Sequence, residues 1–346
     1  MIQPLLSIVI ANYNYGRFLE EAIQSVLCQV DETMCLPSGE RIELIIVDGE
    51  STDNSVEIIQ SFSDHLGGVR FWERESATVN NANSANGGQS AVGSGGNYNS
   101  RTLDLSNFRP RFLWCSERDR GQSHAFNKGF ERANGRFLTW LNADDVMFPG
   151  SLARMSRKIA DNPTTEWFAG GCFWLDQDMK VVKCSRARPF SKHRARCGNL
   201  SVWGPSSFFS KDLWERSGRV DVELHYMMDT DLWNRFYFKQ GAMYRMIEGY
   251  CWGLRLHPDA KMSGHNFASS PLSCPEHPAW RQRQRESAQI RERYKFRRPS
   301  LLGRCTPLTI LYYFLSRYDT CRLSGKLYSE CFGSGAEQVS SGKECD

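Results

Sequence analysis

Several short runs of buried-type residues, each followed by a helical pattern, constrain the fold of this chain more than any other feature. "LSIVIANYN", which ends at Asn14, is rich in β-branched residues, as strands buried on both faces are. The next stretch places Phe18, Leu19, Ile23 and Val26 at helical spacing. "IELIIVDG" repeats the strand pattern. This alternation predicts an α/β fold, a three-layer αβα sandwich around a mostly parallel central sheet.

The same reading extends the alternation through the first 265 residues, as one domain. "RFLTWL" and "YCWGLRL" predict further strands, "EWFAGGCFWLDQDMKVVKC" predicts a β-hairpin, and "DTDLWNRFYF" predicts a helix. Asn54 and Glu57 have the spacing of a capping box. A stretch rich in Asn, Ser and Gly, about 76–106, predicts a surface insertion that cannot bury a core, with a role as an active-site lid left open.

Residues 266–346 predict a basic helical extension with a disordered end. Trp280 to Arg304 is strongly basic, and "LTILYYFL" follows it. This tail is interpreted as a helix packed on the first domain or as a contact with anionic lipid at a membrane surface. Nucleic acid is not expected as a partner, because the net charge of the chain is only +4 and no groove-reading motif accompanies the basic stretch.

The compartment is inferred from what the sequence lacks. The 12 cysteines form no Cys-x-x-Cys pair, which favours reduced thiols over disulfides or structural zinc. The first residues do not have the pattern of a signal peptide, and no apolar run is long enough to span a bilayer. We therefore expect a cytoplasmic protein. Peripheral contact with the inner face of the membrane is left open.

The stretch "WLNADDVMFPG" places two adjacent carboxylates directly after a predicted buried strand. Carboxylates that are close repel each other, and an unpaired one is costly in a low-dielectric place. Asp144 or Asp145 could be the N-cap of a helix that begins near Pro149, but a cap needs only one acid. Alternatively, one of the two binds Mg²⁺ or Mn²⁺, which take one or two carboxylates together with substrate phosphates. The pair alone leaves both interpretations open.

Six stretches taken together resemble family 2 glycosyltransferases, which invert the configuration of the transferred sugar and have the Rossmann-like GT-A fold. The resemblance covers roughly residues 5–264, and six pieces in the right order are far more specific than any one. In chain order they are "SIVIANYNYGRFLEEAIQSVL", "ELIIVDGESTDNSVEII", "SERDRGQSHAFNKGF", "FLTWLNADDVMFPGSL", "HYMMDTDLWNRF" and "LRLHPDAKMSG".

The resemblance implies a donor site for a nucleoside-diphosphate sugar, with a UDP-sugar as the default. Asp48 would hydrogen-bond the base, although a turn residue before Gly49 is its plain structural alternative. The remaining positions implied to line the nucleoside, diphosphate or sugar are Ala11, Asn12, Tyr13, Arg120, Gly121, Gln122 and Asn142. Backbone N–H groups at the start of the helix after Gly121 would favour the negatively charged diphosphate.

The resemblance also implies the metal ligand and the general base. The Asp-x-Asp metal motif of similar sequences falls on Asn142-Ala143-Asp144, so that Asn replaces the first Asp and Asp144 is expected to hold Mn²⁺ or Mg²⁺, with His257 as a tentative second ligand. Arg255 and Lys261 are candidates to neutralise phosphate charge. The base of similar sequences falls on Asp229, with Met228 in place of the preceding Glu; Asp231 is the alternative base.

The sequence therefore predicts a metal-dependent transferase that moves a sugar to a hydroxyl of a glycan or a lipid-linked acceptor. Two rival classes stay open. A sugar nucleotidyltransferase would need a glycine-rich phosphate-binding loop, whereas "IANYNYGRF" has one glycine. A catalytically silent sugar- or nucleotide-binding scaffold protein would account for the replacements at Asn142 and Met228.

Overall fold

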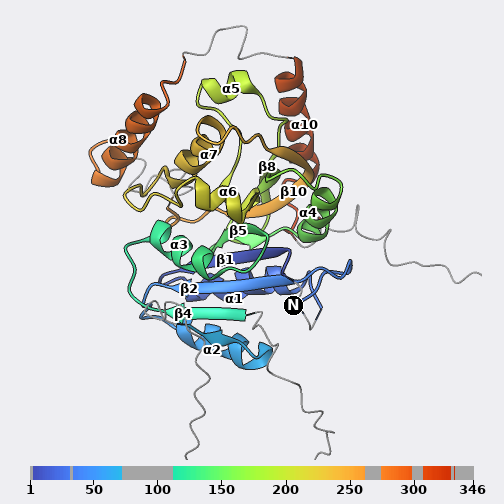
Figure 1. Ribbon diagram of the computed structural model, residues 1–346, viewed down its shortest axis with the longest axis vertical. Helices are drawn as coiled ribbons and strands as arrows, with labels where there is room; N and C mark the ends of the chain where they lie inside the picture. The colour runs from blue at the N-terminus through green and yellow to red at the C-terminus, as the bar shows by residue number, and fades with distance from the viewer. Residues whose placement is uncertain are drawn as a thin grey trace, which may run out of the picture.

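The computed structural model describes residues 3–31, 34–71, 112–261, 274–297, 307–328 and 331. The predicted insertion at about 76–106 and the predicted boundary at 265–266 lie outside these residues. The described chain forms one large sheet flanked by helices, with β4 at one end of the sheet and β10 and β8 toward the other (Figure 1).

The strands are joined in the order β3-β4-β2-β1-β5-β9-β7-β10-β6, and β8 pairs with β7 outside this path. Pairing is parallel from β3 to β5 and between β7 and β10, and it is antiparallel where β9, β6 and β8 join. The bounds are β1 Leu6–Asn12, β2 Ile42–Asp48, β3 Val69–Arg70, β4 Phe112–Ser116, β5 Phe137–Asn142, β6 Val146–Met147, β7 Trp167–Leu175, β8 Val181–Ser185, β9 Ser207–Ser210 and β10 Arg245–Arg255.

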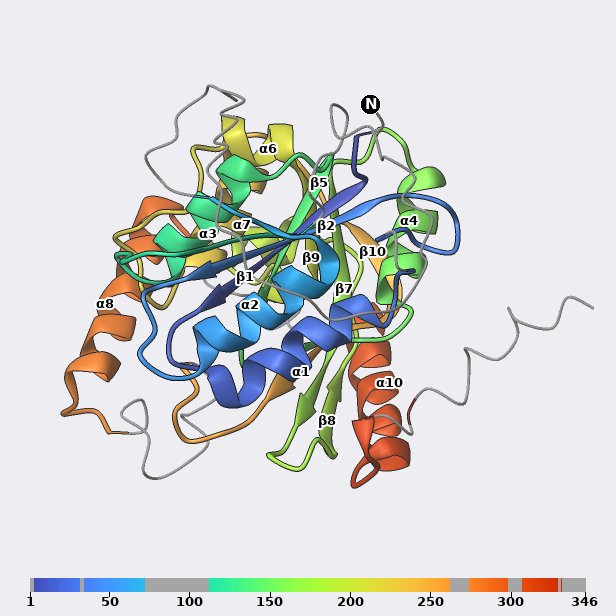
Figure 2. The same cartoon turned by 90° about the horizontal axis from the view of Figure 1, so that it is seen from below.

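The helices lie on both faces of this sheet, which gives the predicted three layers. Alternate residues of β1 enter different cores: Ile8 packs with α1, α2 and α4, whereas Val9 packs with α3, α6 and α7. Figure 2 shows α1 and α2 side by side across one face. The bounds are α1 Gly16–Leu27, α2 Ser55–Leu66, α3 Gln122–Arg132, α4 Ser151–Ala160, α5 Lys192–Arg196, α6 Lys211–Arg216, α7 Met228–Phe238, α8 Pro278–Arg293 and α10 Pro307–Leu323.

The strand order explains where a site can form. Because β1, β2, β4, β5, β7 and β10 all point the same way, their carboxyl ends meet at one edge of the sheet. In open α/β sheets this is the edge where ligands bind. The predicted hairpin is confirmed as β7 and β8, and the predicted helix around Asp231 is confirmed as α7.

The C-terminal extension is helical where it is described, and it packs on the sheet domain. On α8, Ile290 joins the core formed by α3 and α7. The other helix, α10, packs beside β8. No helix among the described residues is long and apolar enough to cross a membrane.

Candidate active site

Polar residues end four neighbouring strands, and also β10, at the carboxyl edge of the sheet. Each of them is the last residue of its strand: Asn12, Asp48, Ser116, Asn142 and Arg255. The register places Asn12 beside Asp48 and Asp48 beside Ser116. A row of strand-end hydrogen-bonding groups is thus built into the pairing of the sheet, and the sequence-predicted residues of the donor site begin here.

Asp48 is fully buried and is the centre of a hydrogen-bond network. Its Oδ1 accepts from Asn12 Nδ2 at 2.7 Å and from Ser51 Oγ at 2.5 Å, and its Oδ2 accepts from Ser116 Oγ at 2.7 Å. The backbone N–H of Ser51 also donates to Oδ2, at 3.0 Å. A carboxylate offers about four lone-pair sites, so Asp48 is saturated by the protein. Its predicted bond to a base stays a prediction, and it requires one of these hydroxyl groups to give way.

Tyr13 and Asp119 flank the opening next to this network. The Tyr13 side chain is 60% exposed, whereas Asn12 is buried. A Cβ at Gly49 would come within 2.9 Å of Asp119 Oδ2 and 3.3 Å of the Tyr13 ring, so the absence of a side chain at Gly49 lets the two approach. Burial raises the pKa of Asp119, which accepts a hydrogen bond from the Gly121 N–H at 2.7 Å. The sequence analysis missed Asp119.

The predicted diphosphate segment lies at the start of α3. Gly121 has a φ of 103°, a left-handed conformation that favours glycine, and it stands at the N-cap of α3. The Arg120 residue is exposed, while the Gln122 side chain reaches the strand-end row and donates from Nε2 to Asn142 Oδ1 at 2.8 Å. Gln122 and Asn142 are therefore brought together, as the sequence-predicted donor site requires.

Asp144 and Asp145, the acid pair that follows β5, separate into two environments. Asp144 Oδ2 lies 3.1 Å from His257 Nε2, and the Asp144 side chain remains 16% exposed. Asp145 is turned inward, where Oδ1 accepts from the Arg255 N–H at 2.9 Å and Oδ2 accepts from Asn142 Nδ2 at 2.7 Å. Burial, followed by the charge of Asp144, raises the pKa of Asp145 well above its usual range.

The structure excludes the helix-cap explanation for this acid pair. The helix after Pro149 begins at Ser151, and its N-cap is Gly150, with no side-chain cap hydrogen bond. Asp144 instead faces His257, whose ring is 2% exposed and lies 4.8 Å from the Phe18 ring, centroid to centroid. Nδ1 of His257 is buried and has no hydrogen-bond partner among the described residues.

A chain of hydrogen bonds connects the acid pair with the segment after β10. Lys261 Nζ donates to Gln122 Oε1 at 2.9 Å, Gln122 donates to Asn142, and Asn142 donates to Asp145. Each amide in the chain donates from its nitrogen and accepts at its oxygen. This explains the Asn at position 142, because an Asp there would present a second acceptor to the carboxylate of Asp145.

Two cations occupy this region, in different environments. The Arg255 guanidinium pairs with Glu21 and donates from Nε to the Asp144 backbone carbonyl at 3.0 Å. It therefore stabilises the backbone of the turn that carries the acid pair. Burial lowers the pKa of Lys261 to about 8, against the opposing attraction of Glu286, Asp229 and Asp144. Lys261 is thus electrostatically coupled to both candidate catalytic acids.

The two acids of α7 have different partners. Asp231 is fully buried and accepts from Arg235 Nε at 2.7 Å, Arg293 Nη1 at 2.7 Å and the Tyr294 hydroxyl at 2.9 Å. Asp229 remains partly exposed, and its Oδ1 accepts hydrogen bonds from the backbone N–H and the hydroxyl of its neighbour Thr230. Burial raises the pKa of Asp229. Asp229 therefore has fewer hydrogen-bond donors around its carboxylate than Asp231 and is the acid that is better able to accept a proton.

A residue that sequence reasoning missed fixes the loop before Asp229. Glu286 on α8 is 4% exposed, and its carboxylate accepts from the backbone N–H groups of His225, Tyr226 and Met227, at 3.0, 2.7 and 3.0 Å. The helix of the extension thereby caps the start of α7. The only signal in the sequence was an acid inside the strongly basic stretch 280–304.

A sequence profile described as glycosyl transferase family 2 matches residues 7–92 and 101–200, more than half of the chain. The chain belongs to glycosyl transferase family 2. Family membership together with the mostly parallel sheet between two helical layers confirms the predicted GT-A fold of this glycosyltransferase.

Curated relatives of this chain include two proteins described as uncharacterised glycosyltransferases. One, from Nostoc, is 29% identical over 150 residues, 43% of this chain and 31% of the relative. The other, from Rickettsia prowazekii, is 22% identical over 251 residues, 70% of this chain and 61% of the relative. A PGL/p-HBAD biosynthesis glycosyltransferase of Mycobacterium bovis is 24% identical over 190 residues, 51% of this chain and 55% of the relative. The chain thus spans less than two thirds of each relative's length.

Two solved structures are similar in fold. Residues 1–349 of TarS from S. aureus are 12% identical, with a TM-score of 0.47, covering 92% of this chain and 80% of that one. A mannosyltransferase of Pyrobaculum calidifontis, solved with GDP-Man and Mn²⁺, is 14% identical, with a TM-score of 0.48, covering 97% of this chain and 80% of that one.

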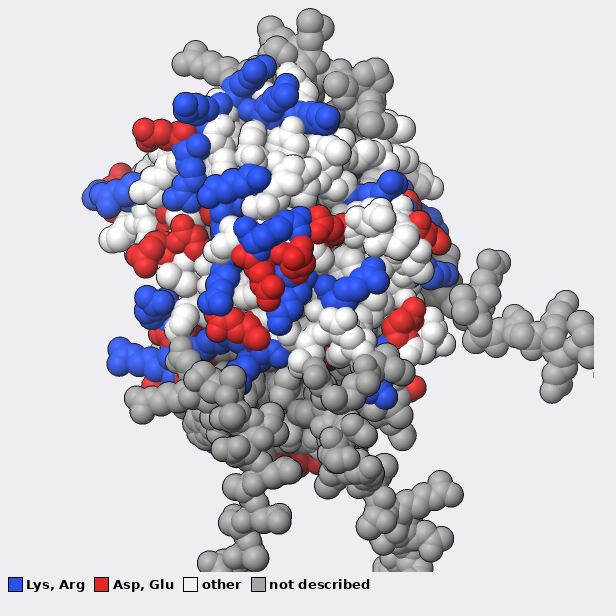
Figure 3. Space-filling model, in the orientation of Figure 1, with Lys and Arg blue, Asp and Glu red and all other residues white. Residues whose placement is uncertain are grey.

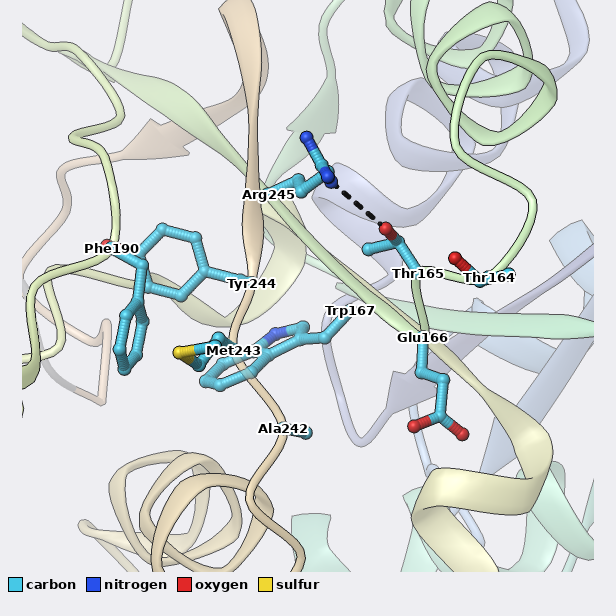
Figure 4. Close-up of a pocket in the computed structure, with 9 residues that line it drawn as sticks. All are labelled: Thr164, Thr165, Glu166, Trp167, Phe190, Ala242, Met243, Tyr244 and Arg245. Carbon is cyan, nitrogen blue, oxygen red and sulfur yellow. Dashed lines mark hydrogen bonds between the residues drawn. The ribbon is translucent and has the colours of Figure 1, made fainter.

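A cavity of about 470 Å³ in this glycosyltransferase lies away from the strand-end row (Figure 4). It is lined by residues at the amino ends of β7 and β10, including Trp167 and Arg245, whereas His257 follows the carboxyl end of β10. In Figure 4 the rings of Phe190 and Tyr244 border it on one side, and Arg245 bonds Thr165 on the other. Because it lies at the opposite ends of these strands, we do not assign the donor site to it.

Proposed function

We propose that this glycosyltransferase moves a sugar from a nucleoside-diphosphate sugar, with a UDP-sugar as the first candidate, to a hydroxyl group of a glycan or lipid-linked acceptor, with inversion. The observation that carries the proposal is the hydrogen-bonded chain from Lys261 through Gln122 and Asn142 to Asp145. Lys261, at one end of this chain, interacts electrostatically with the candidate metal ligand Asp144 and with the candidate base Asp229, which supports one shared site for the two acids.

The donor half is assigned to the strand-end row. Exposed Tyr13 offers a face on which a base can stack, with Ala11 and Asn12 beneath it. The buried network around Asp48 makes this floor rigid, because it ties β1, β2 and β4 to the loop that carries Ser51. The N-terminal end of α3 supplies the positive end of its helix dipole, and exposed Arg120 supplies a positive charge, for the diphosphate.

The metal-binding role is assigned to Asp144, with His257 as the second ligand. Carboxylate oxygen and imidazole nitrogen suit Mn²⁺, and the two side chains already converge at 3.1 Å. The described residues contain no group of three or more metal-ligating side chains, which fits a cation whose remaining ligands are substrate phosphates and water. Such a cation would stabilise negative charge on the leaving nucleoside diphosphate.

The base is assigned to Asp229. Inverting displacement needs a carboxylate that removes the proton from the acceptor hydroxyl on the face opposite the leaving group. A raised pKa makes Asp229 a stronger proton acceptor than an ordinary aspartate, while Asp231 is held by Arg235 and Arg293. Lys261, still cationic below about pH 8, then offers charge to the diphosphate while balancing the nearby acids.

The test measures nucleoside diphosphate release from a panel of nucleotide-sugars with Mn²⁺, with and without a chelator. We expect Asp144→Ala to abolish the metal-dependent part. Asp229→Asn should lower turnover by about 10²–10⁴-fold, the usual contribution of a general base, with donor affinity nearly unchanged. The matched control is Asp178→Ala, because Asp178 is an exposed acid in the β7–β8 turn. Wild-type turnover in Asp229→Asn would move the base to Asp231.

One observation favours the silent-scaffold alternative. Met228, at the position of a Glu in similar sequences, is buried, with the Ser123 hydroxyl 2.9 Å from its sulfur, so it serves the contact between α7 and α3. A thermal-shift screen separates the two functions. A protein that any donor stabilises but that releases no nucleoside diphosphate with any acceptor hydroxyl or with water is a binding protein.

A further inference from the structure

The second helix of the C-terminal extension, α10, exposes several large apolar side chains. A helix on a soluble protein normally turns its apolar side toward the core and its polar side toward water. In α10, the exposed side chains include Ile310, Leu311, Tyr313, Phe314 and Tyr318, which are 42, 51, 49, 61 and 64% exposed. These five make up nearly half of the exposed large hydrophobic residues in the described part of the chain.

The side of α10 that faces the sheet includes polar side chains that bond to the β8 segment. The backbone N–H groups of Cys184 and Arg186 donate to Thr320 Oγ1 and Ser316 Oγ, at 3.0 and 3.1 Å. The Arg186 guanidinium binds both carboxylate oxygens of Asp319, at 2.5 and 2.8 Å. The side chains of α10 therefore cover the outer edge of β8, an edge that would otherwise invite pairing with another strand. This arrangement fixes which face of the helix points outward.

The outward face is aromatic and cationic, without an exposed acid. Ile310, Phe314 and Tyr318 follow one another at intervals of four residues, so they lie along one stripe. Arg317 donates to the Tyr313 hydroxyl at 3.3 Å, and Arg322 is exposed further along the helix. The single acid of α10, Asp319, is turned inward and neutralised by Arg186. The face is thus apolar with a positive rim.

The surroundings carry the same charge. Helix α5, at the same upper end of the molecule in Figure 1, contains Lys192, His193, Arg194 and Arg196 and no acid. Figure 3 shows Lys and Arg side chains gathered over this upper region. By contrast, α8 exposes polar and basic side chains and none of the large exposed hydrophobic residues. It could attract an anionic surface, but it has no large exposed apolar side chains to insert into one.

We propose that the outward face of α10, from Ile310 to Tyr318, inserts into the interfacial region of an anionic lipid bilayer. Aromatic side chains with flanking Arg residues are the composition that binds at the level of the headgroups. Charge complementarity selects anionic lipid over a second copy of this chain. In a two-fold dimer this face would meet itself, so the same positively charged rim would be present on both partners. The proposal does not depend on the proposed reaction.

The test is sedimentation of the full chain with vesicles of phosphatidylcholine alone or with about one third phosphatidylglycerol. We expect binding to the anionic vesicles that weakens with salt. The double variant Phe314→Ser/Tyr318→Ser should lose about tenfold or more in vesicle affinity, since removing one buried aromatic side chain costs at least that factor. The matched control, Met243→Ser, alters a residue that is 48% exposed and lies at the Figure 4 cavity. It should bind as the wild type does.

Two results overturn the proposal. One is a wild-type chain that stays in the supernatant with anionic vesicles at low salt. The other is a wild-type chain that forms dimers by light scattering, with the double variant monomeric and vesicle binding unchanged, which would assign the face to a second copy. The melting temperature of the double variant should be unchanged, because the two replaced side chains are more than half exposed. An unchanged value shows that a change in vesicle binding or in oligomeric state is not caused by unfolding.

Discussion

Replacing Asn142 by Asp would restore the Asp-x-Asp motif of similar sequences, yet we expect it to weaken the protein rather than improve metal binding. Asn142 donates from Nδ2 to Asp145 Oδ2 at 2.7 Å and accepts from Gln122 at 2.8 Å. An aspartate keeps the acceptor for Gln122 but turns the donor toward Asp145 into an acceptor. Asp145 is 1% exposed, so water cannot readily take over the lost contact.

The size of the effect follows from these contacts. A hydrogen bond to a charged group contributes about 1.5–3 kcal/mol, and the Asn142→Asp change loses one and adds repulsion between two carboxylates. We expect the free energy of unfolding to fall by about 3 kcal/mol near pH 8. Burial and Asp144 already raise the pKa of Asp145. Stability tied to a raised carboxyl pKa is present at low pH and lost as the pH rises, so the defect should shrink toward pH 5.

The assay is urea denaturation in the presence of a chelator at pH 5.5 and pH 8, with Asn142→Ala as the matched control. Asn142→Ala removes the donor without adding charge, so the excess loss in Asn142→Asp measures the repulsion between carboxylates. Turnover with Mn²⁺ should fall in Asn142→Asp. A variant that is as stable as the wild type at pH 8 and turns over faster with Mn²⁺ would refute this account of the hydrogen-bonded chain.

Three further predictions concern the acceptor side of the site. Glu286→Ala leaves three backbone N–H groups without their acceptor, so it should lower the free energy of unfolding by about 3 kcal/mol and reduce kcat; Glu286→Gln, which keeps one acceptor oxygen, should recover part of both in denaturation and rate measurements. The value of kcat/KM should rise with pH as Asp229 loses its proton, above the usual Asp range, and fall near pH 8 as Lys261 becomes neutral. If kcat/KM of Lys261→Met still falls near pH 8, the alkaline decrease does not come from Lys261. Asp231→Asn should cost about 3 kcal/mol of stability, because it breaks a buried ion-pair network, while kcat of the folded fraction changes less than tenfold.

The sequence predicted the fold well because its signals are local. Buried strands, helical spacing and the hairpin around Asp176 are all encoded within short windows, and each appears in the structure. The predicted capping box at the start of α2 was only partly right, because several polar side chains there compete for the same backbone N–H groups. Asn54 is the N-cap of α2, as predicted, but its side chain makes no cap hydrogen bond. Asp53 accepts from the N–H groups of Ser55 and Gly16 instead, at 3.0 and 2.8 Å.

The candidate site was less predictable because it depends on contacts between distant segments. Sequence position put Asp48 and Asn142 at strand ends, but not the saturation of Asp48 by Ser51 and Ser116. Likewise, nothing local says that the neighbouring acids Asp144 and Asp145 point in different directions. That separation depends on Arg255 and His257, which lie more than a hundred residues further along the chain.

The extension after residue 265 cannot be separated from the catalytic domain in function, whatever its boundary in sequence. Asp229 and Asp231 both lie in the first turn of α7, and α8 contacts the chain on both sides of Asp229. Glu286 binds the loop before it, while Arg293 and Tyr294 bind Asp231. Asp231 is occupied by these structural contacts, which supports Asp229 as the proposed base. Removing α8 should therefore free Asp231, loosen the proposed base and lower turnover before it lowers donor binding, because none of the predicted donor residues lies on α8.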